Sequence, residues 1–217
     1  GDSGLALSRP VPVERLPGFG DGWVSVQDPG AQRAAEILAP REGSRVLDAC
    51  AAPGGKTAHL LERAPLALLA LDLKPSRCRR ISENLARLGL SAEVKAADCA
   101  RLDGWWDGKP FDAVLADVPC TASGVVRRNP DAKWLRRDAD IASFAKAQAR
   151  ILDALWQVLA PGGKLLYATC SVFPEENTEQ IASFMARQSD ALSCHEEQIL
   201  PDAEHDGFFY CLLKKHG

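Results

Sequence analysis

The alternation of short apolar runs with longer amphipathic stretches most restricts how this chain can fold. It predicts strands at residues 45–50, 66–71, 93–97, 111–117, 164–168 and 208–213, with a weaker one at 193–199. It predicts helices at residues 25–38, 56–62, 143–159 and 175–187, and a further helix that passes through Ile81, Leu85 and Leu88 and ends at Gly89. Strands separated by helices of this length form βαβ units, so we predict an α/β fold with a mostly parallel, doubly wound sheet.

The domain organisation is simple. Residues 1–22 contain three prolines and no apolar periodicity, so we interpret them as an irregular entry segment. Residues 23–217 then form one Rossmann-like domain. The chain opens on Gly1 rather than Met, which we interpret as a fragment of a longer protein.

Composition excludes several classes of protein. The chain has 26 Lys and Arg residues and 29 Asp and Glu residues, which gives a net charge of −3. This charge excludes a protein that binds nucleic acid over its whole surface, but it allows a local basic patch. No apolar run is long enough for a membrane span. Seven cysteines without a C-x-x-C pair argue against a disulfide framework and a zinc site. We therefore expect a cytoplasmic monomer without metal or membrane partner.

The glycine-rich turn after the first predicted strand allows several interpretations. Gly55-Lys56-Thr57 matches the end of a phosphate-binding P-loop, and residues 111–117 resemble a Walker B strand, but Cys50 stands where the first glycine is required. The G-x-G-x-x-G pattern of dinucleotide sites is absent. A nucleoside cofactor with a sulfonium and an amino-acid tail would suit the close backbone approach that small residues permit. An ordinary βα turn is the remaining alternative.

Two carboxylates follow the next strands. Asp72 ends the second strand, where it could accept both ribose hydroxyls of a nucleoside or cap the next helix. Asp98 follows the third strand, where it could meet an adenine edge or serve only as a turn residue.

Two cysteines and a further carboxylate follow the fourth and fifth strands. Asp117 and Cys120 come after one strand and Cys170 after the other, so a doubly wound sheet would bring all three to one crevice. Nucleophilic thiol chemistry is plausible there. The remaining thiols, apart from that of Cys50, are predicted to be small buried groups: Cys78, Cys99, Cys194 and Cys211.

Taken together, these motifs resemble a known family. The motifs are Leu47-Asp-Ala-Cys-Ala-Ala-Pro-Gly-Gly-Lys-Thr57, Asp117-Val-Pro-Cys120 with Ser123-Gly124, and Tyr167-Ala-Thr-Cys-Ser171 with Pro174-Glu175-Glu176-Asn177. In this order they resemble the RNA (cytosine-5) methyltransferases of the Nol1/Nop2/Sun family. Residues 125–137 and 206–210 are most similar to the bacterial Sun/Fmu branch, which methylates 16S ribosomal RNA.

The resemblance implies a fold, a cofactor and a substrate. The fold is that of class I S-adenosylmethionine-dependent methyltransferases, a doubly wound, mostly parallel seven-stranded sheet with a C-terminal antiparallel strand. The cofactor is S-adenosyl-L-methionine, and the partner is ribosomal RNA that presents a single-stranded or flipped cytosine. An N-terminal helical RNA-binding domain of that branch would be missing from this chain.

The resemblance also implies roles for individual residues. Cys170 would be the nucleophile, Cys120 would assist product release, and Asp117 would lie between cofactor and base. The DNA cytosine-5 methyltransferases instead use the thiol of their Pro-Cys motif as the nucleophile. The alternative in which Cys120 attacks the base therefore stays open. Asp72 would hold the ribose and Asp98 the adenine, and the methionine and ribose would be lined by Cys50, Ala51, Ala52, Pro53, Gly54, Gly55 and Lys56.

A basic cluster after Cys120 suggests where RNA could bind. Trp134 lies among five cations, a mixture that suits phosphate contact plus base stacking: Arg127, Arg128, Lys133, Arg136 and Arg137. A solvated helix face is the simpler interpretation. The function alternatives are a P-loop nucleotide hydrolase and a catalytically inert RNA-binding module.

Overall fold

A seven-stranded sheet forms the centre of the molecule. The computed structural model describes residues 4–217, without the side chains of residues 132, 133 and 138. The strands run in the order β3-β2-β1-β4-β5-β7-β6, and β7 is antiparallel to both of its neighbours while the other pairs are parallel. Their bounds are β1 (Arg45–Asp48), β2 (Ala67–Asp72), β3 (Glu93–Ala96), β4 (Phe111–Asp117), β5 (Leu159–Thr169), β6 (Ala191–Ile199) and β7 (Phe208–Lys215). The predicted α/β fold with a C-terminal antiparallel strand is confirmed.

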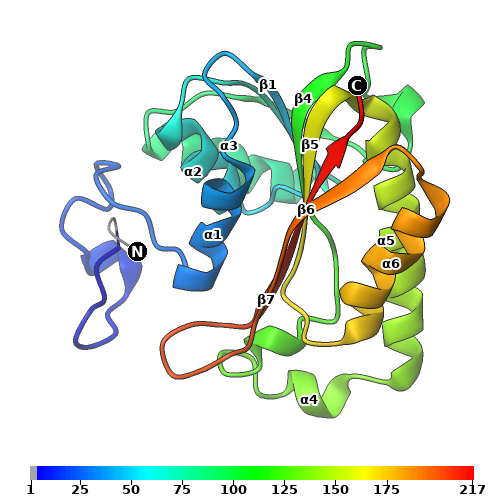
Figure 1. The fold of residues 1–217 in the computed structure, drawn as a ribbon. Helices are drawn as coiled ribbons and strands as arrows, with labels where there is room; N and C mark the ends of the chain where they lie inside the picture. Colours follow the sequence, from blue (N-terminus) through cyan, green and yellow to red (C-terminus); the bar gives the residue numbers. More distant parts are fainter. Residues whose placement is uncertain (1–3) are drawn as a thin grey trace.

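Helices cover both faces of this sheet (Figure 1). One layer contains α1 (Pro29–Leu38), α2 (Gly55–Arg63) and α3 (Pro75–Arg87), and the other contains α5 (Asp138–Val158) and α6 (Thr178–Arg187). Val114 of β4 packs in the apolar cluster with α5 and α6, whereas its neighbour Leu115 packs in the cluster with α1, α2 and α3. Because successive side chains of a strand point to opposite faces, the central strands must be apolar at every position.

Several elements differ from the prediction at their ends. The helix predicted at 25–38 begins at Pro29, after the Asp28 carboxylate caps the amide of Gly30 at 2.8 Å. The helix predicted at 143–159 is α5, which begins five residues earlier, at Asp138. The strand predicted at 164–168 is β5, which begins at Leu159 because the backbone of Leu159 pairs with Phe111, with a break in register before the main part of the ladder. The sequence analysis did not identify α4 (Ala132–Leu135) or four 3₁₀ turns, which are η1 (Val13–Arg15), η2 (Leu102–Gly104), η3 (Ser123–Val125) and η4 (Pro174–Glu176).

The weakest predicted strand is complete in the structure. β6 pairs with β7 along its whole length, but most of its side chains are exposed. An edge strand of this kind carries little apolar alternation, which explains its faint signal in the sequence.

The entry segment packs against the domain. Within residues 4–22 the only regular element is η1, as an irregular segment predicts. The guanidinium of Arg87, at the end of α3, donates to the carbonyl oxygens of Phe19 at 2.7 Å and Val24 at 3.0 Å. It also lies 4.0 Å from the centroid of the Phe19 ring. These contacts attach the segment to α3.

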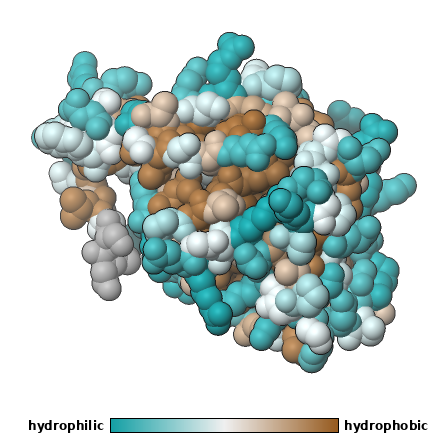
Figure 2. All heavy atoms as spheres, turned by 90° about the horizontal axis from the view of Figure 1, so that it is seen from above, coloured by the Kyte–Doolittle hydropathy of each residue, from teal (hydrophilic) through white to brown (hydrophobic). Residues whose placement is uncertain are grey.

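The parallel strands end where α4 and the loop after β4 lie, in the lower part of Figure 1. Ligands of open α/β sheets bind at this end. Figure 2 looks onto the other end, where apolar side chains occupy the middle of the face and hydrophilic ones surround them. No helix of the described chain is long and apolar enough to cross a membrane.

Candidate active site

The glycine turn joins β1 to α2 by a backbone path that needs glycine. Gly54 adopts φ +99°, in the left-handed region, and caps α2. A Cβ built on it would lie 3.2 Å from the backbone of Ile81 in α3. The neighbouring Gly55 has open space at the same point, so the start of α2 faces a region that a ligand can enter.

Asp72 supports this turn from the end of β2. Its carboxylate is buried and accepts hydrogen bonds from the amides of Ala52 at 3.3 Å and Lys74 at 3.2 Å. Arg77 lies 3.5 Å from the same carboxylate and donates to the carbonyl oxygen of Ala52 at 3.0 Å. Asp72 therefore lies next to the turn and holds it in place.

Lys56 and Asp117 form an ion pair across the crevice. The ammonium of Lys56 lies 2.7 Å from the Asp117 carboxylate, and both side chains are largely shielded from solvent. Burial alone would lower the pKa of Lys56, but the Asp117 charge outweighs burial and raises it. Lys56 thus remains a cation beside the end of β4.

Asp48, at the end of β1, is a buried acid whose role the sequence analysis missed. Thr57 donates to one of its oxygens at 2.7 Å, and the other oxygen has no hydrogen-bond partner. Burial raises the pKa of Asp48 to about 7. The sequence signal that could have identified Asp48 is its position at the end of an apolar strand, immediately before the glycine turn.

The two predicted thiols meet in the crevice. Cys120 Sγ lies 3.4 Å from Cys170 Sγ, although the residues come from the loops after different strands. A hydrogen bond from the Cys120 thiol lowers the pKa of Cys170. Burial and the nearby Asp117 carboxylate oppose this effect, and Lys56 adds a smaller contribution in its favour. The same contact, together with burial, raises the pKa of Cys120. Cys170 is therefore the thiol that ionises more readily.

Asp98 and Cys50 each come two residues after the end of a strand, β3 and β1 respectively. Asp98 follows β3, accepts the amide of Ala100 at 3.0 Å in a turn, and pairs with Arg150 at 3.3 Å. Cys50 is half-buried, and its sulfur lies 3.9 Å from that of Cys99. Cys78, Cys99 and Cys211 are buried as predicted, whereas the prediction for Cys194 is wrong. Cys194 is exposed because it lies on the edge strand β6.

Most of the predicted basic cluster makes contacts within the chain. Arg127 and Arg128 form ion pairs with the carboxylates of Asp28 and Asp206, which are almost completely buried. Arg136 donates to the carbonyl oxygen of Thr121. Arg127, Arg128 and Arg136 thus tie the loop after Cys120 to its surroundings, while the side chains of Arg127 and Arg128 stay 42% and 54% exposed.

The rest of the cluster is divided. The side chain of Lys133 lies outside the described residues. Arg137 is exposed, and Trp134 is 83% exposed on α4. Exposure on this scale leaves Trp134 available for base stacking.

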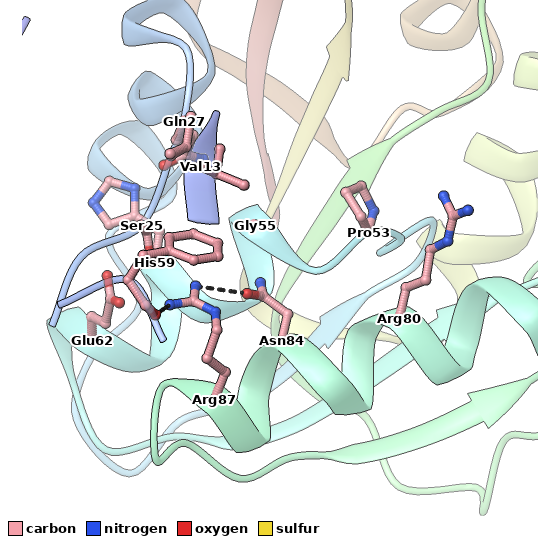
Figure 3. Close-up of a pocket in the computed structure, with 12 residues that line it drawn as sticks. Val13, Ser25, Gln27, Pro53, Gly55, His59, Glu62, Arg80, Asn84 and Arg87 are labelled. Atoms are coloured by element: carbon pink, nitrogen blue, oxygen red, sulfur yellow. Dashed lines mark hydrogen bonds between the residues drawn. The ribbon is translucent and has the colours of Figure 1, made fainter. Parts of the chain in front are cut away.

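A separate cavity of about 250 Å³ lies behind the glycine turn (Figure 3). Pro53, Gly55 and His59 line it on one side, and Arg80 and Asn84 of α3 line it on another. The thiols and Asp117 are not among its lining residues, so it is distinct from the crevice. Within residues 4–217, no group of three or more His, Cys, Asp or Glu side chains could hold a metal ion.

Residues 35–214 match the family model of the 16S rRNA methyltransferases RsmB/F. The chain belongs to this family. The match confirms the resemblance to the Sun branch. It also rules out the alternative that the chain is a P-loop nucleotide hydrolase. A ribosomal RNA small subunit methyltransferase B of Vibrio cholerae is 50% identical to this RsmB/F-family chain over 222 residues, which cover 99% of the chain but 51% of the relative. The chain thus spans about half the length of the curated relatives it matches.

Solved structures with the same fold include two that resemble the chain closely. The crystal structure of PH0851 superposes with a TM-score of 0.91 at 30% identity, over 95% of this chain and 50% of that one. NSun6 from Pyrococcus horikoshii, solved with SFG, has a TM-score of 0.86 at 28% identity, over 95% of this chain and 57% of that one. The RsmB/F-family chain thus has the fold of a class I methyltransferase domain.

Proposed function

We propose that this chain catalyses methyl transfer from S-adenosyl-L-methionine to carbon 5 of a cytosine in 16S ribosomal RNA. The observation that carries the proposal is the pair of thiols 3.4 Å apart beside the Lys56–Asp117 ion pair. The small-subunit RNA substrate is suggested by the name of the Vibrio cholerae relative. A cytoplasmic location would follow from that substrate.

The turn between β1 and α2 fits the cofactor. Gly55 leaves open space at the start of α2, and one oxygen of Asp48, at the end of β1, is buried without a hydrogen-bond partner. When bound, S-adenosylmethionine would supply an electrophilic methyl group. Its methionine and ribose would contact residues 50–56, its ribose hydroxyls Asp72, and its adenine Asp98. NSun6 was solved with SFG, an analogue of this cofactor, which supports the assignment.

The chemistry requires a nucleophile because carbon 5 of cytosine is too weak to attack a methyl group unaided. The Cys170 thiolate would form a bond to carbon 6 and push an electron pair toward carbon 5. Asp117 would lie near nitrogen 3 and, when it carries a proton, would donate a hydrogen bond that stabilises the negative charge developing on the ring. The Lys56 cation would stabilise the same charge.

Product release must reverse this attack. After carbon 5 gains the methyl group, its proton leaves, the sulfur–carbon 6 bond breaks, and the electron pair of the lost proton restores the aromatic ring. Cys120 is in contact with Cys170 and would assist this elimination. The lowered pKa of Cys170 and the raised pKa of Cys120 favour Cys170 as the nucleophile. In the DNA cytosine-5 methyltransferases the thiol of the Pro-Cys motif has that role instead. An inert RNA-binding module would not need both thiols in contact.

Cys170→Ala tests the proposal. The variant should lose methyl transfer and the covalent adduct with RNA that contains 5-fluorocytosine, while calorimetry shows S-adenosylmethionine affinity within threefold of the wild type. Cys120→Ala should instead accumulate a denaturation-resistant protein–RNA complex on a gel. An adduct that persists in Cys170→Ala and disappears in Cys120→Ala would reverse the two roles.

A further inference from the structure

Glu176, in η4, is a carboxylate buried without a counter-ion. It is 0% exposed, and none of the described Lys, Arg or His side chains forms an ion pair with it. A buried carboxylate is unfavourable unless hydrogen bonds satisfy its oxygens. An apolar side chain would fill the same space more favourably, so the charge needs a specific reason.

Its hydrogen bonds supply that reason. One oxygen accepts from the amide of Thr121 at 2.9 Å and from the side-chain amide of Gln148 at 3.0 Å. The other accepts from the hydroxyl of Thr121 at 2.5 Å and from the hydroxyl of Ser171. All four partners donate, and only a carboxylate without a proton can accept four such bonds.

Two of these partners directly follow the thiols in the chain. Thr121 comes after Cys120, and Ser171 comes after Cys170, so one carboxylate binds the loops after β4 and β5 together. Gln148 strengthens the link because it also donates to the carbonyl oxygen of Pro119 at 3.0 Å. The peptide group after Cys120 is thus held directly by Glu176, and the residue before Cys120 is held through Gln148.

We propose that Glu176 is a positioning residue that sets the contact between Cys120 and Cys170. It does so by bonding at once to the residue after each thiol. The inference rests on the proposed function only in that these thiols perform the chemistry. The position of the thiols can be measured without any methyl transfer.

The matched variants are Glu176→Gln and Glu175→Gln. Glu176→Gln keeps the shape but turns two acceptor sites into donors that would face donors. Glu175→Gln makes the same change on the exposed neighbour. Ser171→Ala is the second test variant, because it removes the bond from the Cys170 side to Glu176 and leaves the carboxylate in place. It also removes the contacts of the Ser171 hydroxyl with Ser123, Thr121 and the amide of Phe173.

The readout is disulfide formation by diamide, which takes up two electrons and two protons as a thiol pair is oxidised. Cys50 and Cys99, 3.9 Å apart, form an internal reference pair in the same protein. Mass spectrometry of the peptides gives the initial rate of the Cys120–Cys170 bond relative to that of the Cys50–Cys99 bond. A general loosening of the fold would change both rates, whereas lost positioning changes only the first.

We expect the ratio to fall at least fivefold in Glu176→Gln, less in Ser171→Ala, and not at all in Glu175→Gln. The kcat for methyl transfer should fall at least tenfold in Glu176→Gln, with the KM for RNA within threefold. Unchanged ratios in both Glu176→Gln and Ser171→Ala would overturn the proposal. An equal change in the rates at which the Cys120–Cys170 and Cys50–Cys99 disulfides form would also overturn it. A ratio that falls while kcat stays normal would confirm the positioning role and refute the proposed thiol chemistry.

Discussion

At the scale of single residues, two charges and two thiols determine the reactivity of the crevice. Lys56 stays protonated because Asp117 pairs with it, and its positive charge adds to the hydrogen bond from Cys120 in favouring the Cys170 thiolate. Burial and the Asp117 carboxylate work against that thiolate, so the contact with Cys120 decides the balance.

Cys120→Ala should therefore raise the pKa of Cys170. A thiolate reacts with iodoacetamide and a thiol does not, so the alkylation rate of Cys170 rises with pH through its pKa. In the wild type this rise should occur below the pH typical of cysteine. In Cys120→Ala it should move upward, and a shift of about one unit would make alkylation at pH 7 about tenfold slower. Mass spectrometry of the Cys170 peptide measures the rate, with Cys194 as the exposed internal control.

An unchanged alkylation profile in Cys120→Ala would contradict this explanation. It would mean that the contact with Cys120 does not set the ionisation of Cys170.

At the scale of elements, the site depends on the conformation of two connections: the glycine turn between β1 and α2, and the loop after β4. Gly54 starts α2 from a left-handed conformation pressed against α3. The loop after β4 is fixed by Arg127 and Arg128, which pair with carboxylates from the α1 cap and from the segment before β7. Each turn is thus held by an element far away in the sequence.

Gly54→Ala should weaken cofactor binding as well as stability. The left-handed backbone costs a side chain about 1 kcal/mol, and the new Cβ would also press on Ile81 at 3.2 Å. Gly43→Ala is the control, because Gly43 has φ +76° but open space at its Cβ. Both variants should lose stability in urea titrations, and only Gly54→Ala should lose affinity for S-adenosylmethionine in calorimetry. Equal affinity in both variants would remove the glycine turn from the cofactor site.

Arg127→Ala combined with Arg128→Ala should destabilise the protein. It would leave Asp28 and Asp206 buried without cations. Loss of one partner of a buried pair is costly, but these arginines are about half exposed, so we expect a loss of about 2 kcal/mol in the free energy of unfolding. Arg79→Ala combined with Arg80→Ala removes the same charge from the exposed face of α3 and should cost little. Urea unfolding of both double variants compares them, and equal stability would show that the ion pairs contribute nothing.

At the scale of the whole molecule, the charge of the chain bears on the proposed binding of RNA. The net charge is −3, and several of the expected phosphate contacts are used within the chain. The curated relatives are about twice as long as this chain. We therefore expect the other half of those relatives to supply much of the affinity for RNA.

This expectation can be measured by filter binding. With about three phosphate contacts, the affinity of this chain for ribosomal RNA should fall with a log–log salt slope of about −2. The full-length Vibrio cholerae relative should bind more tightly and with a steeper slope, while its S-adenosylmethionine affinity should be similar. Equal RNA affinity and equal slopes would show that this domain recognises its substrate by itself.

Local patterns in the sequence were sufficient for the order of strands and helices. The buried strands read as apolar runs because both faces are covered, and the end of each strand identified Asp72, Asp117, Cys120 and Cys170. The edge strand β6 left only a weak signal because its side chains are exposed. Family membership could likewise be recognised from motifs in order, without any coordinates.

Only the tertiary structure decided which groups touch. The contact between Cys120 and Cys170 depends on β4 lying beside β5, and the register of those strands is a property of the whole sheet. The pairing of Arg128 with Asp206 joins two loops that no periodicity connects. The same holds for Glu176, whose partners come from three separate segments. A sequence records which side chains are available, whereas their distances follow from long-range packing, which local propensity does not contain.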